Sequence, residues 1–277
     1  MHSRPATAAL LREHGLAPRR DLGQNFVTDP NTVRRIARLA SVGPGDHVIE
    51  VGAGLGSLTL ALAETGADVT ALEVDRGVVA VLRSVVAEAG VINVRIVEGD
   101  AMASDWTELT ADAERWALVA NLPYNIATPL VADLLDDVPA IERMLVMVQR
   151  EVGERWCAPP GSDPYGAISV KIAYWSIARL VGSVPASVFL PRPNVESVLV
   201  AIERRPSPAV DVPPRPLFEL VRAAFAQRRK MLRRSLAGIV DPSAFAAAGV
   251  DASRRPEELD VHEWAALTRA HLAATAP

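Results

Sequence analysis

Residues 47–57 read His47-Val48-Ile49-Glu50-Val51-Gly52-Ala53-Gly54-Leu55-Gly56-Ser57, and this stretch decides the fold. Its first half is a short apolar run bounded by glycines, which predicts a buried strand from His47 to Val51. The glycines that follow alternate with other residues, and such a strand-to-helix turn lets the backbone approach a ligand closely. The sequence therefore predicts a strand–turn–helix unit that binds a ligand, with its helix over residues 57–64.

Predicted strands and helices alternate on either side of this unit. Further strands are expected at residues 69–73, 94–97, 117–120 and 144–148, and helices at residues 32–40, at 75–89 and from Thr128 onward. This alternation predicts an α/β fold with a parallel sheet covered by helices on both faces.

The pattern changes after about residue 165. Two later strands are expected at residues 177–184 and 195–202, and the proline-rich stretch 205–216 resembles a linker. Beyond it every segment is helical in pattern. We therefore expect one domain over residues 1–209, which includes a basic N-terminal leader, and a small all-α domain over residues 210–277.

A cofactor site is expected at the ends of the first strands. Glu73 ends the second of these strands, about 20 residues after the glycines, where a carboxylate can accept both hydroxyls of a ribose. A dinucleotide site would need its third glycine where Ser57 stands. The turn instead looks like the S-adenosylmethionine site of Rossmann-like methyltransferases. Asp100 follows the next strand and can accept a hydrogen bond from an adenine amine, although a turn or cap aspartate is also common there.

Asn121-Leu122-Pro123-Tyr124 follows the expected strand at 117–120 and is the most specific motif in the chain. It resembles the motif of methyltransferases that act on planar amine nitrogens. The lone pair of an adenine amine is delocalised into the ring, so methyl transfer requires groups that localise it. The Asn121 side chain and the Leu122 carbonyl can hold the amine hydrogens, while Tyr124 offers a face for stacking. Phe189, in a proline-rich loop, could form the opposite wall of a base pocket, although such a residue is more often in a core.

Charge and composition set the broad class. The net charge is −4, yet residues 1–44 hold seven arginines against three acidic residues, and residues 204–234 hold nine basic against two acidic residues. Such segments can attract a polyanion or can be ordinary solvated faces. Cys157 is the one cysteine, no Cys/His cluster suggests a metal, and we expect neither a secretory signal nor a membrane span. A cytoplasmic location fits these features.

Taken together, the motifs resemble those of the small-subunit ribosomal RNA adenine dimethyltransferases, and the resemblance covers nearly the whole chain. It rests on the cofactor and catalytic motifs above and on four further segments: Leu22-Gly23-Gln24-Asn25-Phe26, Gln149-Arg150-Glu151-Val152, Phe189 to Ser197, and Phe225-Ala226-Gln227-Arg228-Arg229-Lys230. It implies a Rossmann-like S-adenosylmethionine-dependent methyltransferase that forms N6,N6-dimethyladenosine at two adjacent adenosines near the 3′ end of 16S ribosomal RNA, within the immature 30S subunit.

The resemblance also implies roles for individual residues. The cofactor-binding set would be Gln24, Asn25, Val27, Gly52, Gly54, Glu73, Asp100 and Asn121, and the catalytic set Asn121, Leu122, Pro123, Tyr124 and Phe189. The helical domain would dock on the pre-ribosome, with phosphate contacts from Arg222, Arg228, Arg229, Lys230, Arg233 and Arg234. Because no self-complementary apolar patch is evident, we expect a monomer.

Three alternatives remain at this point. A large-subunit RNA methyltransferase of the macrolide-resistance type shares the fold and the Asn-Leu-Pro-Tyr motif, but the late proline-rich and Gln-Arg-Arg-Lys segments count against it. A non-enzymatic RNA- or DNA-binding scaffold would not need Asn121 or Tyr124. A nicotinamide oxidoreductase is disfavoured by Ser57 and by the lack of an evident Tyr-Lys or His-Asp arrangement.

Overall fold

The structure is a computed structural model, and it describes residues 1–123 and 125–275. The chain divides into two compact units, one of residues 1–153 and 179–203 and the other of residues 154–178 and 204–277. No helix in the described residues combines the length and apolar composition that crossing a bilayer requires.

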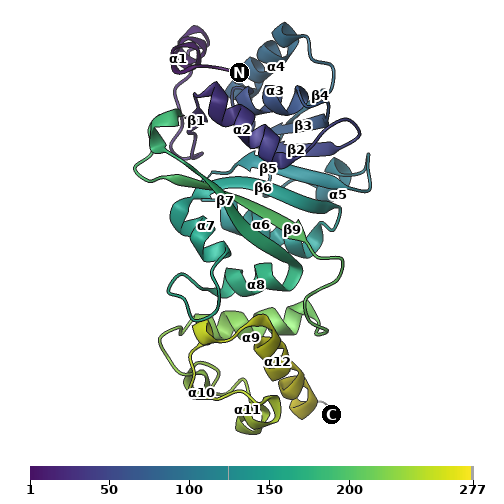
Figure 1. Ribbon diagram of the computed structural model, residues 1–277, viewed down its shortest axis with the longest axis vertical. Coiled ribbons are helices and arrows are strands. Elements are labelled where there is room, and N and C mark those ends of the chain that lie inside the picture. Colours follow the sequence, from purple (N-terminus) through teal and green to yellow (C-terminus); the bar gives the residue numbers. More distant parts are fainter. Residues whose placement is uncertain (124, 276–277) are drawn as a thin grey trace. The chain divides into compact units, whose positions relative to one another are not determined.

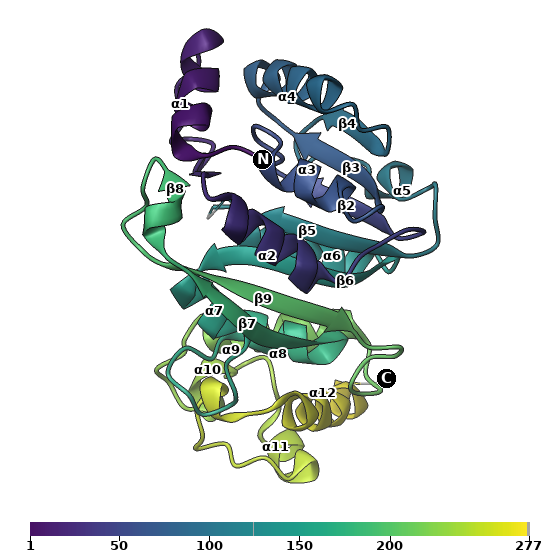
Figure 2. The same ribbon diagram turned by 45° about the horizontal axis from the view of Figure 1, so that its top comes forward.

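The first unit is built around a sheet whose strands lie in the order β4-β3-β2-β5-β6-β9-β7 (Figures 1 and 2). Strands β4 to β6 pair in parallel, whereas β9 runs antiparallel to β6. Strands β1 and β8 form a separate two-stranded antiparallel sheet. The strand bounds are β1 Phe26–Val27, β2 His47–Val51, β3 Asp68–Glu73, β4 Val94–Glu98, β5 Trp116–Asn121, β6 Ile141–Gln149, β7 Ser176–Val184, β8 Phe189–Leu190 and β9 Ser197–Arg204.

Helices cover the large sheet because each has one apolar face. Helices α2 and α3 pack against each other and share a buried cluster with Val48, Val69 and Leu145 of the sheet. Helix α6 contacts β6 and lies behind the sheet in the view of Figure 1. The helix bounds are α1 Arg4–Glu13, α2 Pro30–Ala40, α3 Ser57–Ala63, α4 Arg76–Ala89, α5 Trp106–Leu109, α6 Ala127–Asp137 and α7 Arg150–Trp156, with a 3-10 helix η1 at Ala186–Val188.

The second unit is helical and has its own core. Tyr165, Tyr174, Leu217, Phe218 and Trp264 are among its buried residues. The Tyr174 ring packs edge-on against that of Phe218, with centroids 5.2 Å apart. Its helices are α8 Ala167–Trp175, α9 Pro214–Phe225, α10 Leu232–Ser235, α11 Pro242–Ala248 and α12 Val261–Thr275, with a 3-10 helix η2 at Pro256–Glu258.

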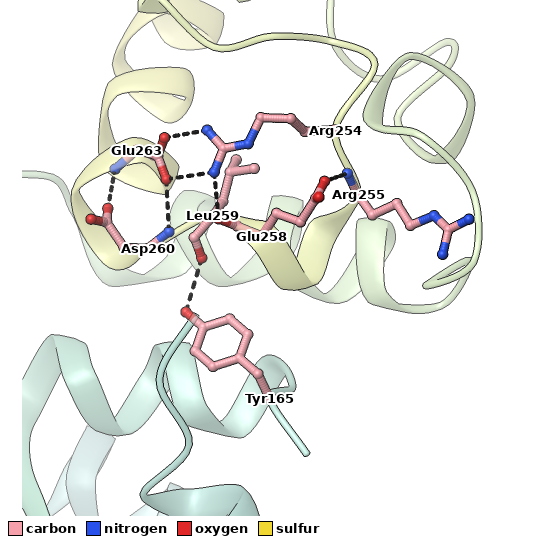
Figure 3. A network of polar contacts seen from close by, with 7 residues as sticks. All are labelled: Tyr165, Arg254, Arg255, Glu258, Leu259, Asp260 and Glu263. Carbon is pink, nitrogen blue, oxygen red and sulfur yellow. Dashed lines mark hydrogen bonds and ion pairs between the residues drawn. The ribbon is translucent and has the colours of Figure 1, made fainter. Parts of the chain in front are cut away.

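The expected domain boundary at 209/210 differs from this division, because residues 154–178 group with the C-terminal helices. The buried hydroxyl of Tyr165 donates to the carbonyl of Leu259 over 2.9 Å, and that of Tyr174 donates to the carbonyl of Val212 over 2.7 Å. Figure 3 shows the first bond reaching a polar network in which Arg254 pairs with Glu263. These bonds join segments distant in sequence, which a local pattern cannot reveal.

Trp264 provides a stability test for the second unit. Its side chain is fully buried and its indole N–H has no hydrogen-bond partner among the described residues. We expect Trp264→Ala to lower the free energy of unfolding by about 3–5 kcal/mol, because it leaves a large cavity. Hydrogen exchange of the α9 and α12 amides would measure this loss.

Trp264→Phe is the matched control. It keeps most of the buried ring and removes an N–H that makes no bond, so it should cost much less than Trp264→Ala. Equal destabilisation by the two variants would contradict this account of the core.

Candidate active site

A cavity opens at the carboxyl ends of the parallel strands, where the strand order reverses between β2 and β5. It encloses about 990 Å³ of empty space, part of it open to solvent. In open α/β sheets, ligands bind at this position, outside the ends of the strands. Residues from the N-terminal segment, the glycine turn and the ends of β3, β4 and β5 line it.

The glycine turn forms one wall of the cavity. Gly52, Gly54 and Gly56 have φ angles of 73°, 56° and 82°, a backbone region that residues other than glycine rarely adopt. A Cβ atom at Gly54 would also lie 3.2 Å from the ring of Phe26. The alternate glycines therefore serve both the backbone turn and the close approach of the N-terminal segment.

Three backbone N–H groups fix the Glu73 carboxyl group at the end of β3. It is only 5% exposed, and its Oε2 accepts a hydrogen bond from the Gly54 N–H at 2.8 Å. Its Oε1 accepts bonds from the N–H groups of Val74 and Asp75, at 3.0 and 2.9 Å. Burial raises the pKa of Glu73, whereas these N–H groups act in the opposite direction. The carboxyl is thus fixed in direction, as an acceptor for ribose hydroxyls must be.

Asn121 ends β5 and joins the N-terminal segment to this strand end. Its Nδ2 donates to the carbonyl of Asn25 over 3.0 Å, which fixes the orientation of the amide. No described residue donates to its Oδ1, nor to the carbonyl of Leu122, whose own N–H is bound to the Met147 carbonyl at 3.1 Å. Both oxygens therefore remain available as hydrogen-bond acceptors at the end of β5.

The structure brings most of the predicted cofactor and catalytic residues to this cavity. Those that line it are Gln24, Asn25, Val27, Gly52, Gly54, Glu73, Asp100, Asn121 and Pro123. Gln24 is bound to the Asp75 carboxylate at 3.0 Å. Tyr124 lies outside the described residues. Leu122 is buried and is not among the residues that line the cavity.

Phe189 is not brought to the cavity. It is 1% exposed and belongs to the buried cluster shared by α2, α3 and the sheet. Its backbone in β8 is paired with Val27 of β1. As it lies here, Phe189 presents no face to a base, because its ring serves the core that supports the N-terminal segment.

Glu50, which was not predicted as a site residue, also lines the cavity. It is 2% exposed, and its Oε2 accepts a bond from the Thr59 hydroxyl at 2.5 Å. The signal was present in the sequence, since a charged residue within an apolar strand next to a glycine turn needs a reason to be buried.

The predicted RNA-binding residues all lie in the second unit. Arg222 is on α9, Arg228 to Lys230 follow it, and Arg233 and Arg234 are on α10. All are exposed except Arg228, which is half-buried. Arg228 donates to the Asp163 carbonyl at 2.5 Å and lies 3.7 Å from Glu257, so it is engaged within the unit.

The contact between Gly23 and Pro123 provides a test of how the N-terminal segment supports the site. Gly23 has a φ of 64°, and a Cβ there would lie 3.0 Å from Cβ of Pro123. Gly23→Ala therefore adds backbone strain and pushes against the catalytic loop. We expect cofactor affinity to fall about 5- to 100-fold, because relief of this contact displaces Pro123 from the cavity wall, at a cost of about 1–3 kcal/mol in binding free energy. Calorimetry with S-adenosylhomocysteine would measure it.

Gly15→Ala is the control, because Gly15 has a φ of 63° but open space around its Cβ position. It shares the backbone cost without the contact. If both variants bind the cofactor equally well, the contact with Pro123 does not support the site.

Fold and cavity together define a class of protein. The sheet with an antiparallel β9, the glycine turn after β2, the carboxylate ending β3 and the Asn121 amide ending β5 define a Rossmann-like S-adenosylmethionine-dependent methyltransferase. The residues fit this cofactor, since they offer an acceptor for its ribose and a cavity lined by acidic groups for its positive charge.

Comparison with known proteins gives the family. The sequence model described as ribosomal RNA adenine dimethylase matches residues 15–270. "Ribosomal RNA small subunit methyltransferase A" of Bifidobacterium adolescentis is 46% identical over 270 residues, covering 92% of this chain and 89% of that protein. The protein of the same name from Thermobifida fusca is 47% identical over 266 residues, covering 93% and 92%. The chain belongs to the ribosomal RNA adenine dimethylase family. It is an S-adenosylmethionine-dependent methyltransferase.

Solved structures share the fold. A dimethyladenosine transferase from Plasmodium falciparum superposes with a TM-score of 0.75 at 22% identity, over 86% of this chain and 94% of that chain. The 23S rRNA methyltransferase ErmE gives a TM-score of 0.69 at 24% identity, over 89% of this chain and 99% of that chain. One of these two proteins is named for 23S rRNA and the other is not, so the fold alone does not select the RNA.

Proposed function

We propose that this enzyme transfers methyl groups to the N6 amines of two adjacent adenosines near the 3′ end of 16S ribosomal RNA, giving N6,N6-dimethyladenosine. Its substrate would be the immature 30S subunit in the cytoplasm, and it would act as a monomer. The choice of the small subunit is supported by relatives that carry the small-subunit name and are 44–48% identical over most of their length.

The observation that carries the proposed chemistry is the orientation of Asn121. Its Nδ2 is occupied by the Asn25 carbonyl, so its Oδ1 is left to accept a hydrogen from the target amine. The Leu122 carbonyl can accept the second hydrogen. Holding both hydrogens this way turns the nitrogen lone pair out of conjugation with the ring. The cofactor supplies an electrophilic methyl group on a sulfonium, and the protein contributes orientation and electrostatics.

We further propose that the helical unit docks on ribosomal RNA through its exposed basic residues. Arg229, Lys230, Arg233 and Arg234 are exposed within a short stretch. Two backbone bonds hold this stretch in place, from Leu232 N–H to the Arg254 carbonyl at 2.8 Å and from Arg233 N–H to the Ala252 carbonyl at 3.0 Å. A fixed row of positive charge suits phosphate contacts. Arg228 would instead stabilise the unit through Asp163 and Glu257.

The test is methyl transfer from tritiated S-adenosylmethionine to unmethylated 30S subunits and, separately, to naked 23S RNA, followed by nucleoside identification. Dimethyladenosine from 30S subunits alone is expected. Label in 23S RNA alone would replace the proposal with the large-subunit function. Label in neither substrate, with cofactor binding intact, would favour a scaffold role.

A further inference from the structure

Glu50 is a buried carboxyl in the cofactor cavity to which the mechanism above gives no role. It lies next to the last residue of β2, pairs in register with Ala71 of β3, and is 2% exposed. The Thr59 hydroxyl from α3 donates to its Oε2 at 2.5 Å. No described residue donates to its Oε1, and Glu50 is among the residues that line the cavity. One oxygen of Glu50 is therefore fixed by the protein and the other is available to a ligand.

The charges around Glu50 are all of one sign. Glu50, Glu73 and Asp100 line the cavity, and no described lysine, arginine or histidine does. Buried carboxylates without a cationic partner are costly, because burial removes hydration that no ion pair replaces. Protonation of a buried carboxyl group removes this cost while the cavity is empty.

The polar groups that share the cavity with Glu50 come from several elements. Strand β3 contributes Glu73, and the turn after β4 contributes Asp100. From β5, α3 and residues 22–27, the cavity lining includes Asn121, Ser57, Gln24 and Asn25, none of which is ionisable. Behind the glycine turn, a ring nitrogen of His2 lies 3.1 Å from the Leu55 carbonyl, and burial lowers the pKa of His2. None of these neighbours supplies a positive charge at neutral pH.

Burial raises the pKa of Glu50 to about 8; the Thr59 hydrogen bond opposes that rise, and Glu73 adds to it. At pH 7 the carboxyl is then mostly protonated in the empty protein. A cation placed in the cavity would reverse this, because an opposite charge nearby favours the ionised form.

We propose that Glu50 is a proton-linked counter-charge for the methyl donor, protonated in the empty cavity and ionised when S-adenosylmethionine is bound. The donor carries a sulfonium and an ammonium against one carboxylate, so its net charge is positive. The product S-adenosylhomocysteine has lost the sulfonium and is neutral overall. Binding the donor would move the Glu50 proton to the buffer, and loss of the donor's charge would let Glu50 take a proton back. The carboxyl would thus favour donor over product.

The test is isothermal titration calorimetry of the full chain at pH 7 in buffers of different ionisation enthalpy, which counts the protons released per ligand bound. We expect about one proton per S-adenosylmethionine for the wild type and clearly fewer for S-adenosylhomocysteine. Between pH 6 and 7.5, donor affinity should rise about tenfold per pH unit and then level off near pH 8, because the carboxyl no longer needs to lose a proton. Product affinity should change much less.

Glu50→Gln is the decisive variant, because it keeps shape and a Thr59 partner but cannot ionise. It should release almost no protons and bind the donor with little dependence on pH, with its folding verified by circular dichroism. Thr59→Val keeps the Glu50 carboxyl but removes the Thr59 hydroxyl, whose hydrogen bond stabilises the ionised form of Glu50. This variant should therefore bind S-adenosylmethionine more weakly and still release a proton on binding. Glu98→Gln, at an exposed position on β4, should behave as wild type.

Three results would overturn the proposal: no proton release with the wild type, the same release with Glu50→Gln, or equal release with donor and product. The last comparison uses the wild type alone and decides the matter even if Glu50→Gln does not fold. None of these measurements depends on the RNA substrate.

Discussion

Asn121→Ala is expected to slow methyl transfer by about 10²–10³-fold, the usual loss when one preorganised polar group at a reacting centre is removed. The reason lies in the two ends of its amide. Nδ2 donates to the Asn25 carbonyl at 3.0 Å, which fixes the orientation of the amide. Oδ1 can then accept a hydrogen from the target amine without a rotation of the Asn121 side chain. Alanine removes the acceptor and also releases the N-terminal segment from the end of β5.

The measurement is single-turnover transfer to saturating unmethylated 30S subunits, together with calorimetry of cofactor binding. Cofactor affinity should fall by no more than about tenfold, because one hydrogen bond between the N-terminal segment and β5 is lost. Binding to 30S subunits should be unchanged. Asn125→Ala, at an exposed position in the same loop, is the control. A transfer rate for Asn121→Ala close to that of the control would remove Asn121 from the mechanism.

The parallel part of the fold could be predicted from sequence because its signals are local. Apolar runs marked β2 and β3 almost to the residue, and the glycine turn marked the start of α3. The antiparallel direction of β9 carried no such signal, since a strand's own residues do not state which way its partner runs. Likewise the grouping of residues 154–178 with the helical unit depends on Tyr165 and Tyr174 contacting residues far away in sequence.

The candidate site was predictable where a residue type and a strand end coincide, as for Glu73 and Asn121. Site residues were harder to predict where burial of the side chain decides what the residue does. Phe189 was predicted to stack on a base, but its ring lies in the core, and Glu50 was predicted only as part of a buried strand although it lines the cavity. Arg228 resembles its basic neighbours in sequence, yet its partners Asp163 and Glu257 distinguish it. Exposure and partners are properties of the folded chain, so they could not be obtained from spacing.

Glu73→Gln is expected to weaken binding of S-adenosylmethionine and S-adenosylhomocysteine alike by about 100-fold or more. The carboxyl accepts three backbone N–H groups, one on Oε2 from Gly54 and two on Oε1 from Val74 and Asp75. A glutamine has one acceptor oxygen and one NH2 group, so whichever way it turns, a donor faces a donor. The mispaired N–H groups lower folding stability, whereas affinity falls because two ribose hydroxyls lose a charged acceptor, and a hydrogen bond to a charged group contributes about 1.5–3 kcal/mol.

Calorimetry with S-adenosylhomocysteine separates this effect from catalysis, and Glu98→Gln serves as the control because it makes the same chemical change at the exposed end of the neighbouring strand. Glu73→Gln should also shift the backbone N–H resonance of Gly54 in the empty protein, because that N–H loses its carboxylate acceptor. Unchanged affinity with a shifted Gly54 resonance would mean that Glu73 shapes the turn but does not hold the ribose. Reduced affinity for both ligands would place Glu73 at a part of the cofactor that S-adenosylmethionine and S-adenosylhomocysteine share. Replacement of Glu50, in contrast, should weaken binding of S-adenosylmethionine more than binding of S-adenosylhomocysteine.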